Sequence, residues 1–158
     1  MRKPFIEKLT ELAKKDPKVI FIIGDVGFSF VEPFKERFPN QFLNVGALEQ
    51  TMMGVAVGLA NVGWKPYVYT MMNFILARPY EQVRNDICYS KANVKLFAVK
   101  GSEAYKFLGM SHNLTEEEEV NLLNSLPNLT RYTFASEDEV ASAMEYEYSR
   151  IGPAYFRI

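Results

Sequence analysis

Apolar runs alternate with amphipathic stretches along this chain. Phe5, Leu9, Leu12 and Ala13 recur at helical spacing, and Asp16-Pro17 ends that predicted helix. Residues 19–23 are apolar at every position, which is typical of a strand buried on both faces of a sheet. The same criteria predict strands at 42–45, 66–70, 94–99, 129–134 and 154–158, helices at 31–38, 47–62 and 79–90, and two more helices beginning at the capping-box pairs Thr115/Glu118 and Ser136/Glu139.

This alternation predicts an α/β fold, with three α/β/α layers around a mostly parallel sheet and right-handed crossovers. No repeat or linker interrupts it, so residues 1–158 are expected to form a single domain. Ligands of such folds bind at the carboxyl ends of the strands. The residues at that edge with side chains suited to chemistry are Asp25, Ser29, Glu49, Phe74, Arg78, Tyr80 and His112.

Composition narrows the class of protein. The 158 residues carry a net charge of −1 without a basic block, so nothing favours nucleic acid or an acidic membrane as a partner. The N-terminus is charged and amphipathic, and no apolar run approaches the roughly 20 residues that span a bilayer. We therefore expect a cytoplasmic protein. Cys88 is the single cysteine, so no disulfide or cysteine-based metal site is expected, and it is interpreted as a small buried apolar residue.

The predicted helix at 47–62 has an unusual composition. Gly54 and Gly58 lie in its interior, where each glycine costs about 1 kcal/mol relative to alanine. Glu49 lies near its start, and either complements the helix N-terminus or acts as a functional acid. An apolar stripe is predicted along one side, and the glycines are explained equally by tight packing inside the domain or by a subunit contact. The stripe comprises Leu48, Met52, Val55 and Leu59.

Several segments together resemble one family. NVGALEQTMMGVAVGLA at 44–60, followed by KPYVYTMMNF, RPYEQVRNDICY, GMSHN and GPAYFRI, is similar to the pyrimidine-binding domain of the transketolase family of thiamine diphosphate enzymes. The resemblance extends from about Phe5 to Ile158. It implies thiamine diphosphate as the cofactor, which acts as the electron sink while a two-carbon ketol unit moves between sugars.

The resemblance also implies roles for individual residues. Glu49 matches the glutamate that hydrogen-bonds N1′ of the aminopyrimidine, which promotes the imino tautomer that deprotonates C2. Asp25 and Val26 match residues near the bent middle of the cofactor, and Phe74 and Tyr80 match aromatic residues of the pyrimidine pocket. His112 matches a histidine with catalytic and substrate contacts. Ser29 matches a position that contacts the sugar phosphate, and Arg78 is a candidate for binding phosphate or carboxylate, with a surface or interdomain ion pair as the alternative.

Three positions depart from the family pattern. Ala77 stands where many members have a second aromatic residue, Asn113 replaces the second histidine of the histidine loop, and Leu108 replaces an acid. These differences bear on the classical ketose-phosphate substrate and on stacking against the pyrimidine. They do not affect the expected activation of the cofactor.

The Gly-Asp-Gly motif that would hold Mg²⁺ and the diphosphate has no match, because Gly24-Asp25-Val26 lacks the second glycine. We therefore expect the diphosphate-binding domain and the C-terminal transketolase domain to be absent. The expected protein is the pyrimidine-binding subunit of a split enzyme, a heterotetramer with a separate subunit that binds diphosphate and Mg²⁺ and with self-association across the 47–62 helix. Alternatives are a fragment of a longer chain, a non-catalytic assembly or regulatory domain, and a component of a 2-oxo acid decarboxylase, dehydrogenase or deoxyxylulose-phosphate-synthase-like enzyme.

Overall fold

The computed structural model describes residues 1–100 and 106–158, and it contains one six-stranded sheet in the order β2-β1-β3-β4-β6-β5. All five strand pairs are parallel, which confirms the predicted α/β class and sharpens "mostly parallel" to wholly parallel in the described residues. The strands are β1 (Val19–Ile23), β2 (Phe42–Asn44), β3 (Lys65–Met71), β4 (Lys95–Val99), β5 (Thr130–Thr133) and β6 (Ala154–Arg157).

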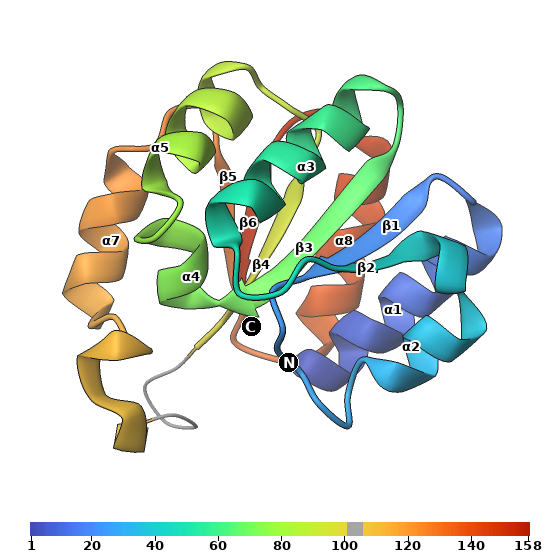
Figure 1. The fold of residues 1–158 in the computed structure, drawn as a ribbon, viewed down its shortest axis with the longest axis horizontal. Helices are drawn as coiled ribbons and strands as arrows, with labels where there is room; N and C mark the ends of the chain where they lie inside the picture. The colour runs from blue at the N-terminus through green and yellow to red at the C-terminus, as the bar shows by residue number, and fades with distance from the viewer. Residues whose placement is uncertain (101–105) are drawn as a thin grey trace.

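Helices cover both faces of the sheet, which gives the expected three layers (Figure 1). One face carries α1 (Arg2–Lys15), α2 (Glu32–Arg37) and α8 (Asp138–Ser149). The other carries α3 (Glu49–Asn61), α4 (Met72–Leu76), α5 (Tyr80–Gln82), its π-helical continuation η2 (Val83–Tyr89) and α7 (Glu116–Asn124). Two 3-10 turns, η1 (Pro39–Gln41) and η3 (Lys106–Ser111), complete the described elements.

The two cores differ in chemistry. The core under α1 is aromatic: the Phe5 ring lies 5.5 Å from Tyr69 and 4.3 Å from Phe97, centroid to centroid. The core under α3 is mainly aliphatic and includes Met52 and Met53. Because α3 rests on this second core, its first turn is held rigidly at the carboxyl edge of the sheet.

The predicted helix at 79–90 is present, as a short α-helix that widens into a π-helix. Other local details differ from the predictions, because the preceding helix α4 was not predicted. Ser136 does not cap α8; instead the Glu139 carboxylate accepts from the backbone nitrogen of Ala135 at 3.0 Å. The capping box of Thr115 and Glu118 is present as predicted.

Two polar or ionisable side chains on the α3 side of the sheet are buried. Glu119, in the first turn of α7, is only 3% exposed; it pairs with Arg157 at 3.1 Å and accepts from the Tyr155 hydroxyl at 2.7 Å. Cys88 is buried as predicted, and burial raises the pKa of its thiol to about 12. No helix in the described ranges is both long and apolar enough to cross a membrane.

A buried ion pair lies at the amino end of β4, away from the carboxyl edge. Lys95 Nζ donates to Glu147 Oε2 at 2.8 Å and to the Gly152 carbonyl at 2.7 Å. Glu147 also accepts from Tyr132 at 2.8 Å and from Arg150 at 2.7 Å. Burial acts to raise the pKa of Glu147, but the hydrogen bonds from Arg150 and Lys95 outweigh it and lower that pKa. The buried carboxylate therefore has two cationic partners, Lys95 and Arg150, and its bond to Lys95 ties α8 to β4.

Replacing Glu147 with alanine should destabilise the protein by about 3–5 kcal/mol, because Lys95 would stay buried without its counter-ion. The measurement is urea unfolding followed by circular dichroism. Because the folded-state pKa of Glu147 is lowered, its contribution exists above the ordinary glutamate pKa and is lost as the pH falls through the folded-state value.

The matched control is Glu145→Ala on the same helix. Glu145 pairs with Lys8 at 2.7 Å, and its side chain is 50% exposed, so its loss should cost less than about 1 kcal/mol. If both substitutions lowered the free energy of unfolding by the same amount, burial of the Glu147 network would not contribute to stability.

Candidate functional site

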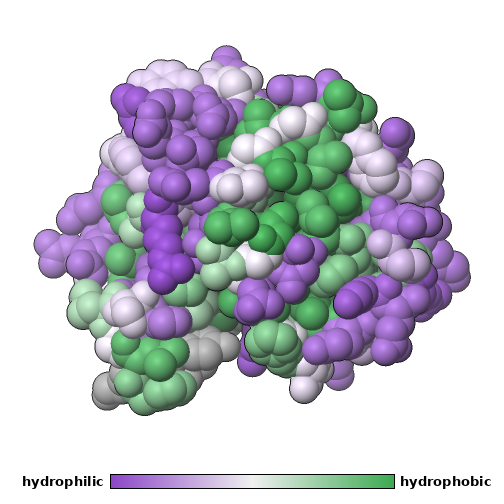
Figure 2. Space-filling model, in the orientation of Figure 1, coloured by the Kyte–Doolittle hydropathy of each residue, from purple (hydrophilic) through white to green (hydrophobic). Residues whose placement is uncertain are grey.

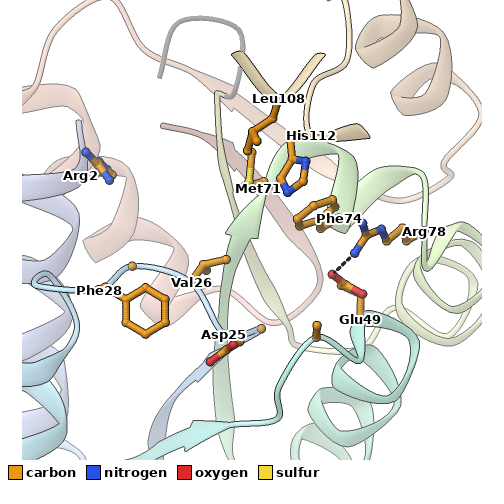
Figure 3. A pocket seen from close by; sticks show the side chains of 13 residues that line it. Arg2, Asp25, Val26, Phe28, Glu49, Met71, Phe74, Arg78, Leu108 and His112 are labelled. Atoms are coloured by element: carbon orange, nitrogen blue, oxygen red, sulfur yellow. Dashed lines mark hydrogen bonds and ion pairs between the residues drawn. The ribbon is translucent and has the colours of Figure 1, made fainter. Parts of the chain in front are cut away.

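A cavity of about 490 Å³ opens at the carboxyl ends of β1 and β3. Figure 3 shows Asp25, Val26 and Phe28 on one side of it and Phe74, Arg78 and His112 on the other. The cavity brings together six of the eight residues singled out from the sequence: Asp25, Val26, Glu49, Phe74, Arg78 and His112.

Ser29 and Tyr80 do not line this cavity. Ser29 has a φ of 63° in the turn before α2, and its backbone nitrogen donates to Glu32 Oε1 at 3.0 Å. The Tyr80 hydroxyl donates to Ser125 Oγ at 2.8 Å, which ties α5 to the end of α7. Their expected contacts with ligand therefore receive no support from the geometry of this chain.

Glu49 is the first residue of α3, and it is only 6% exposed. Its Oε1 accepts a hydrogen bond from Arg78 Nη1 at 2.8 Å. The unpaired N–H groups of the helix N-terminus also favour a negative charge at this place. A buried carboxylate with one cationic partner is thus held at the wall of the cavity with a fixed orientation.

Arg78, Phe74 and His112 form a continuous contact above Glu49. The Arg78 guanidinium carbon lies 3.8 Å from the centre of the Phe74 ring, within the range of a cation–π interaction. The His112 ring meets the same phenyl ring edge-on, at 5.1 Å and 64°. Phe74 therefore orients a cation and an imidazole at once: Arg78 follows directly after α4, whereas His112 comes from the segment before α7.

Asp25 is held by Asn44 from the neighbouring strand. The Asn44 side-chain oxygen accepts from the Asp25 backbone nitrogen at 3.0 Å, and its nitrogen donates to Asp25 Oδ1 at 3.2 Å. Asp25 has a φ of 53°, a left-handed conformation that aspartate tolerates better than most residues. Gly27 follows at φ +86°, where an added Cβ would lie 2.9 Å from Val31. The tight turn after β1 therefore depends on these residue types.

Several cavity residues were missed by the sequence analysis. Phe28 lies shortly after β1 and Met71 is the last residue of β3, and both line the cavity wall. Their positions near the carboxyl ends of strands could have predicted this from the sequence. Arg2 reaches the cavity from the start of α1, where a helical pattern gives no such signal. Leu108, noted only as a departure from the family, also lines the cavity. The described residues contain no group of three or more His, Cys, Asp or Glu side chains placed to hold a metal ion.

The outer face of α3 is apolar and smooth, as Figure 2 shows for the same orientation as Figure 1. A Cβ added at Gly54 or Gly58 would meet nothing within 4 Å, so the glycines do not serve packing inside the domain. Leu48 and Val62 are 57% and 68% exposed at the two ends of the helix. The predicted stripe is wrong in part: Met52 is buried, but the buried face continues through Glu49, Met53 and Ala56 rather than through Leu48.

These features define a parallel α/β domain with a buried carboxylate and an aromatic ring in a cavity at its strand ends. The chain matches the family model described as "Transketolase, pyrimidine binding domain" over residues 1–158, and it belongs to that family.

Known relatives agree with this assignment. The chain is 27% identical to an apulose-4-phosphate transketolase subunit of Actinobacillus succinogenes, over 97% of this chain and 49% of the relative. It is 31% identical to a putative transketolase C-terminal section of Methanocaldococcus jannaschii, over 100% of this chain and 50% of the relative. A solved split-gene transketolase, described as an inactive β4 tetramer, superimposes with a TM-score of 0.84 at 33% identity, over 99% of this chain and 50% of that one. The chain thus spans about half the length of the relatives it matches.

The Glu49–Arg78 pair should show a measurable coupling in a double-mutant cycle. The free energies of unfolding of Glu49→Gln, Arg78→Ala and the double variant are measured in urea. The expected coupling free energy is about 0.5–1 kcal/mol, which is modest because the Arg78 side chain is 46% exposed.

The control cycle combines Arg78→Ala with Glu36→Gln, an exposed acid on α2, and should be additive. Zero coupling between residues 49 and 78 would contradict the ion pair.

Proposed function

We propose that this chain supplies the pyrimidine-binding half of the active site of a thiamine-diphosphate-dependent, transketolase-like enzyme. The observation that carries the proposal is the Glu49 carboxylate, 6% exposed, at the N-terminus of α3 and in the wall of the cavity. A buried acid facing a cavity is expensive to keep unless a ligand or partner uses it. Arg78 accounts for part of its compensation, and a ring nitrogen of the cofactor would account for the rest.

The residues of the cavity fit an aminopyrimidine. A flat heterocycle needs apolar walls and a few hydrogen-bonding groups placed at its edge. Val26, Met71 and Phe74 supply apolar surface, and Glu49 supplies a carboxyl group that can share a proton with a ring nitrogen. Asp25, held by Asn44, stands on the opposite wall. Val26 and Phe74 would therefore hold the ring while Glu49 fixes its orientation.

When bound, thiamine diphosphate would supply a carbon acid, C2, that is nucleophilic once deprotonated, and a cationic thiazolium ring that serves as the electron sink. Glu49 would hold the proton shared with N1′. Arg78 hydrogen-bonds only Oε1, and Oε2 has no hydrogen bond in the described part of the chain, so Oε2 is left to share that proton with the ring. Arg78 would fix the carboxylate in place or bind a substrate phosphate.

The remaining parts of the enzyme would come from other chains or segments. We propose a separate diphosphate-binding subunit that holds Mg²⁺, since the Gly-Asp-Gly motif has no match in this sequence. The outer face of α3 would pack against a second copy, giving a dimer of such pairs. The transferred group would be a two-carbon ketol unit of a sugar or sugar phosphate, which makes the assembled enzyme a transferase. The names of the relatives, among them a subunit of an apulose-4-phosphate transketolase, support this division of labour.

Glu49→Gln should reduce exchange of the cofactor's C2 proton by at least about 10²-fold in the assembled enzyme, because glutamine cannot share a proton with N1′. The exchange is measured by NMR as deuterium incorporation into bound thiamine diphosphate.

The matched control is Glu81→Gln, which also removes an acid from the first turn of a helix but lies outside the cavity. It should leave the exchange rate unchanged. A Glu49→Gln variant that binds cofactor and exchanges at the wild-type rate would overturn the proposed role.

A further inference from the structure

The Ser111 hydroxyl joins two groups in the loop that lines the cavity. Ser111 Oγ donates to the Leu108 carbonyl oxygen at 2.8 Å, and it lies 2.7 Å from His112 Nδ1. A hydroxyl has one proton, whereas a carbonyl oxygen can only accept. If the proton lies toward Leu108, the serine oxygen must accept from the imidazole. His112 then carries its proton on Nδ1.

The opposite arrangement makes fewer hydrogen bonds. A serine that donates to Nδ1 has no proton left for Leu108, so the same atoms form one hydrogen bond instead of two. Neutral imidazole carries its proton on one nitrogen, and the partner of one nitrogen decides the state of the other. The geometry therefore favours the Nδ1–H tautomer, with an unprotonated Nε2.

Hydrogen bonds and a ring contact fix the segment that carries His112, so the tautomer determines which atom faces the cavity. The Asn73 side chain, 5% exposed on α4, donates to the Ser111 carbonyl at 2.8 Å. The Asn113 side chain donates to the Gly109 carbonyl at 2.7 Å, which closes the turn on its other side. The edge-on contact with Phe74 sets the tilt of the His112 ring. Position, tilt and tautomer of the imidazole are thus each set by a different neighbour.

The second ring nitrogen is the one available to a ligand. His112 lines the cavity, and its Nε2 has no hydrogen-bond partner in residues 1–100 and 106–158. An unprotonated Nε2 accepts a hydrogen bond and cannot donate one. It therefore pairs with a hydroxyl, and it offers nothing to a carbonyl or phosphate oxygen.

We infer that Ser111 is a positioning residue that fixes neutral His112 as the Nδ1–H tautomer, so that Nε2 accepts a hydrogen bond from a hydroxyl group of the substrate. This rests on the proposed function for the nature of the substrate, a polyhydroxylated sugar. It adds a selection rule at this position: the group that meets His112 is a hydroxyl donor. Phosphate recognition then falls to the guanidinium groups of the cavity, Arg2 and Arg78.

The direct test is ¹⁵N NMR of the ¹⁵N-histidine-labelled chain, in which His112 is the only histidine. The two ring nitrogens have distinct shifts and couplings in each tautomer, and the spectrum is recorded at a pH where the ring is neutral. The expected result is a predominant Nδ1–H tautomer in the wild-type protein. A predominant Nε2–H tautomer would overturn the inference.

Two variants at Ser111 distinguish the effect of the hydroxyl group from a general disturbance of the fold. Ser111→Ala should move the population toward Nε2–H, because Nδ1 loses its acceptor, while Ser111→Thr should keep Nδ1–H. An alanine variant with the wild-type tautomer, or a threonine variant that behaves like alanine, would contradict the inference. The wild-type spectrum alone decides the tautomer if a variant does not fold.

The kinetic test uses the assembled enzyme with a ketose donor. Ser111→Ala should lower kcat/KM roughly tenfold, as loss of an orienting hydrogen-bond partner typically does. In a His112→Asn background the same change should have little further effect, because Ser111 acts through the imidazole. Additive losses would show that Ser111 acts by another route. The NMR test of the His112 tautomer does not depend on the C2 exchange test of Glu49. Either proposal can therefore be rejected without rejecting the other.

Discussion

The parallel direction of every strand in the described sheet is the constraint on which the site depends. Parallel pairing places all carboxyl ends at one edge, and the register aligns them closely: Ile23 pairs with Asn44 and with Tyr69, and Met71 pairs with Val99. Segments far apart in sequence therefore leave the sheet at the same place. Asp25, Glu49, Phe74 and His112 follow four different strands, and they surround one cavity for this reason.

Polar side chains at this edge are held in place by hydrogen-bonding partners. Glu49 has Arg78, and Asp25 has Asn44, which also accepts from the Gly46 backbone nitrogen at 2.9 Å. Unpartnered polar groups away from water cost free energy, so Arg78 lowers the cost of keeping the buried Glu49 carboxylate in place, whereas Asn44 mainly orients the exposed Asp25. The same pairs fix the directions of both carboxylates. Preorganisation of the cavity therefore follows from the requirement that its polar groups be satisfied.

Much of this arrangement is visible in the sequence. Strand β1 was predictable because a wholly apolar run has few alternatives, and β4 is apolar except for Lys95. The rule that ligands bind at the carboxyl ends of parallel strands then predicted most cavity residues from their order in the chain. Ser29 and Tyr80 were beyond that rule, since a left-handed turn and a hydrogen bond to Ser125 decide where they lie. The π-helix η2 and the burial of Glu119 depend on tertiary contacts that no local pattern encodes.

Helix α3 carries both Glu49 and an exposed apolar face. Its two interior glycines cost roughly 1 kcal/mol each in helix stability, and their faces meet nothing within 4 Å in return. In the proposed assembly the compensation would come from outside the domain, since small residues on an apolar helix face permit close approach of another backbone. Glu49 begins the same helix, one residue after the exposed Leu48. A partner that covers α3 therefore also closes the side of the cavity where Glu49 lies. Assembly and protection of the carboxylate from water are then one event, which explains why a helix that weakens its own domain would carry the acid on which the proposed chemistry depends.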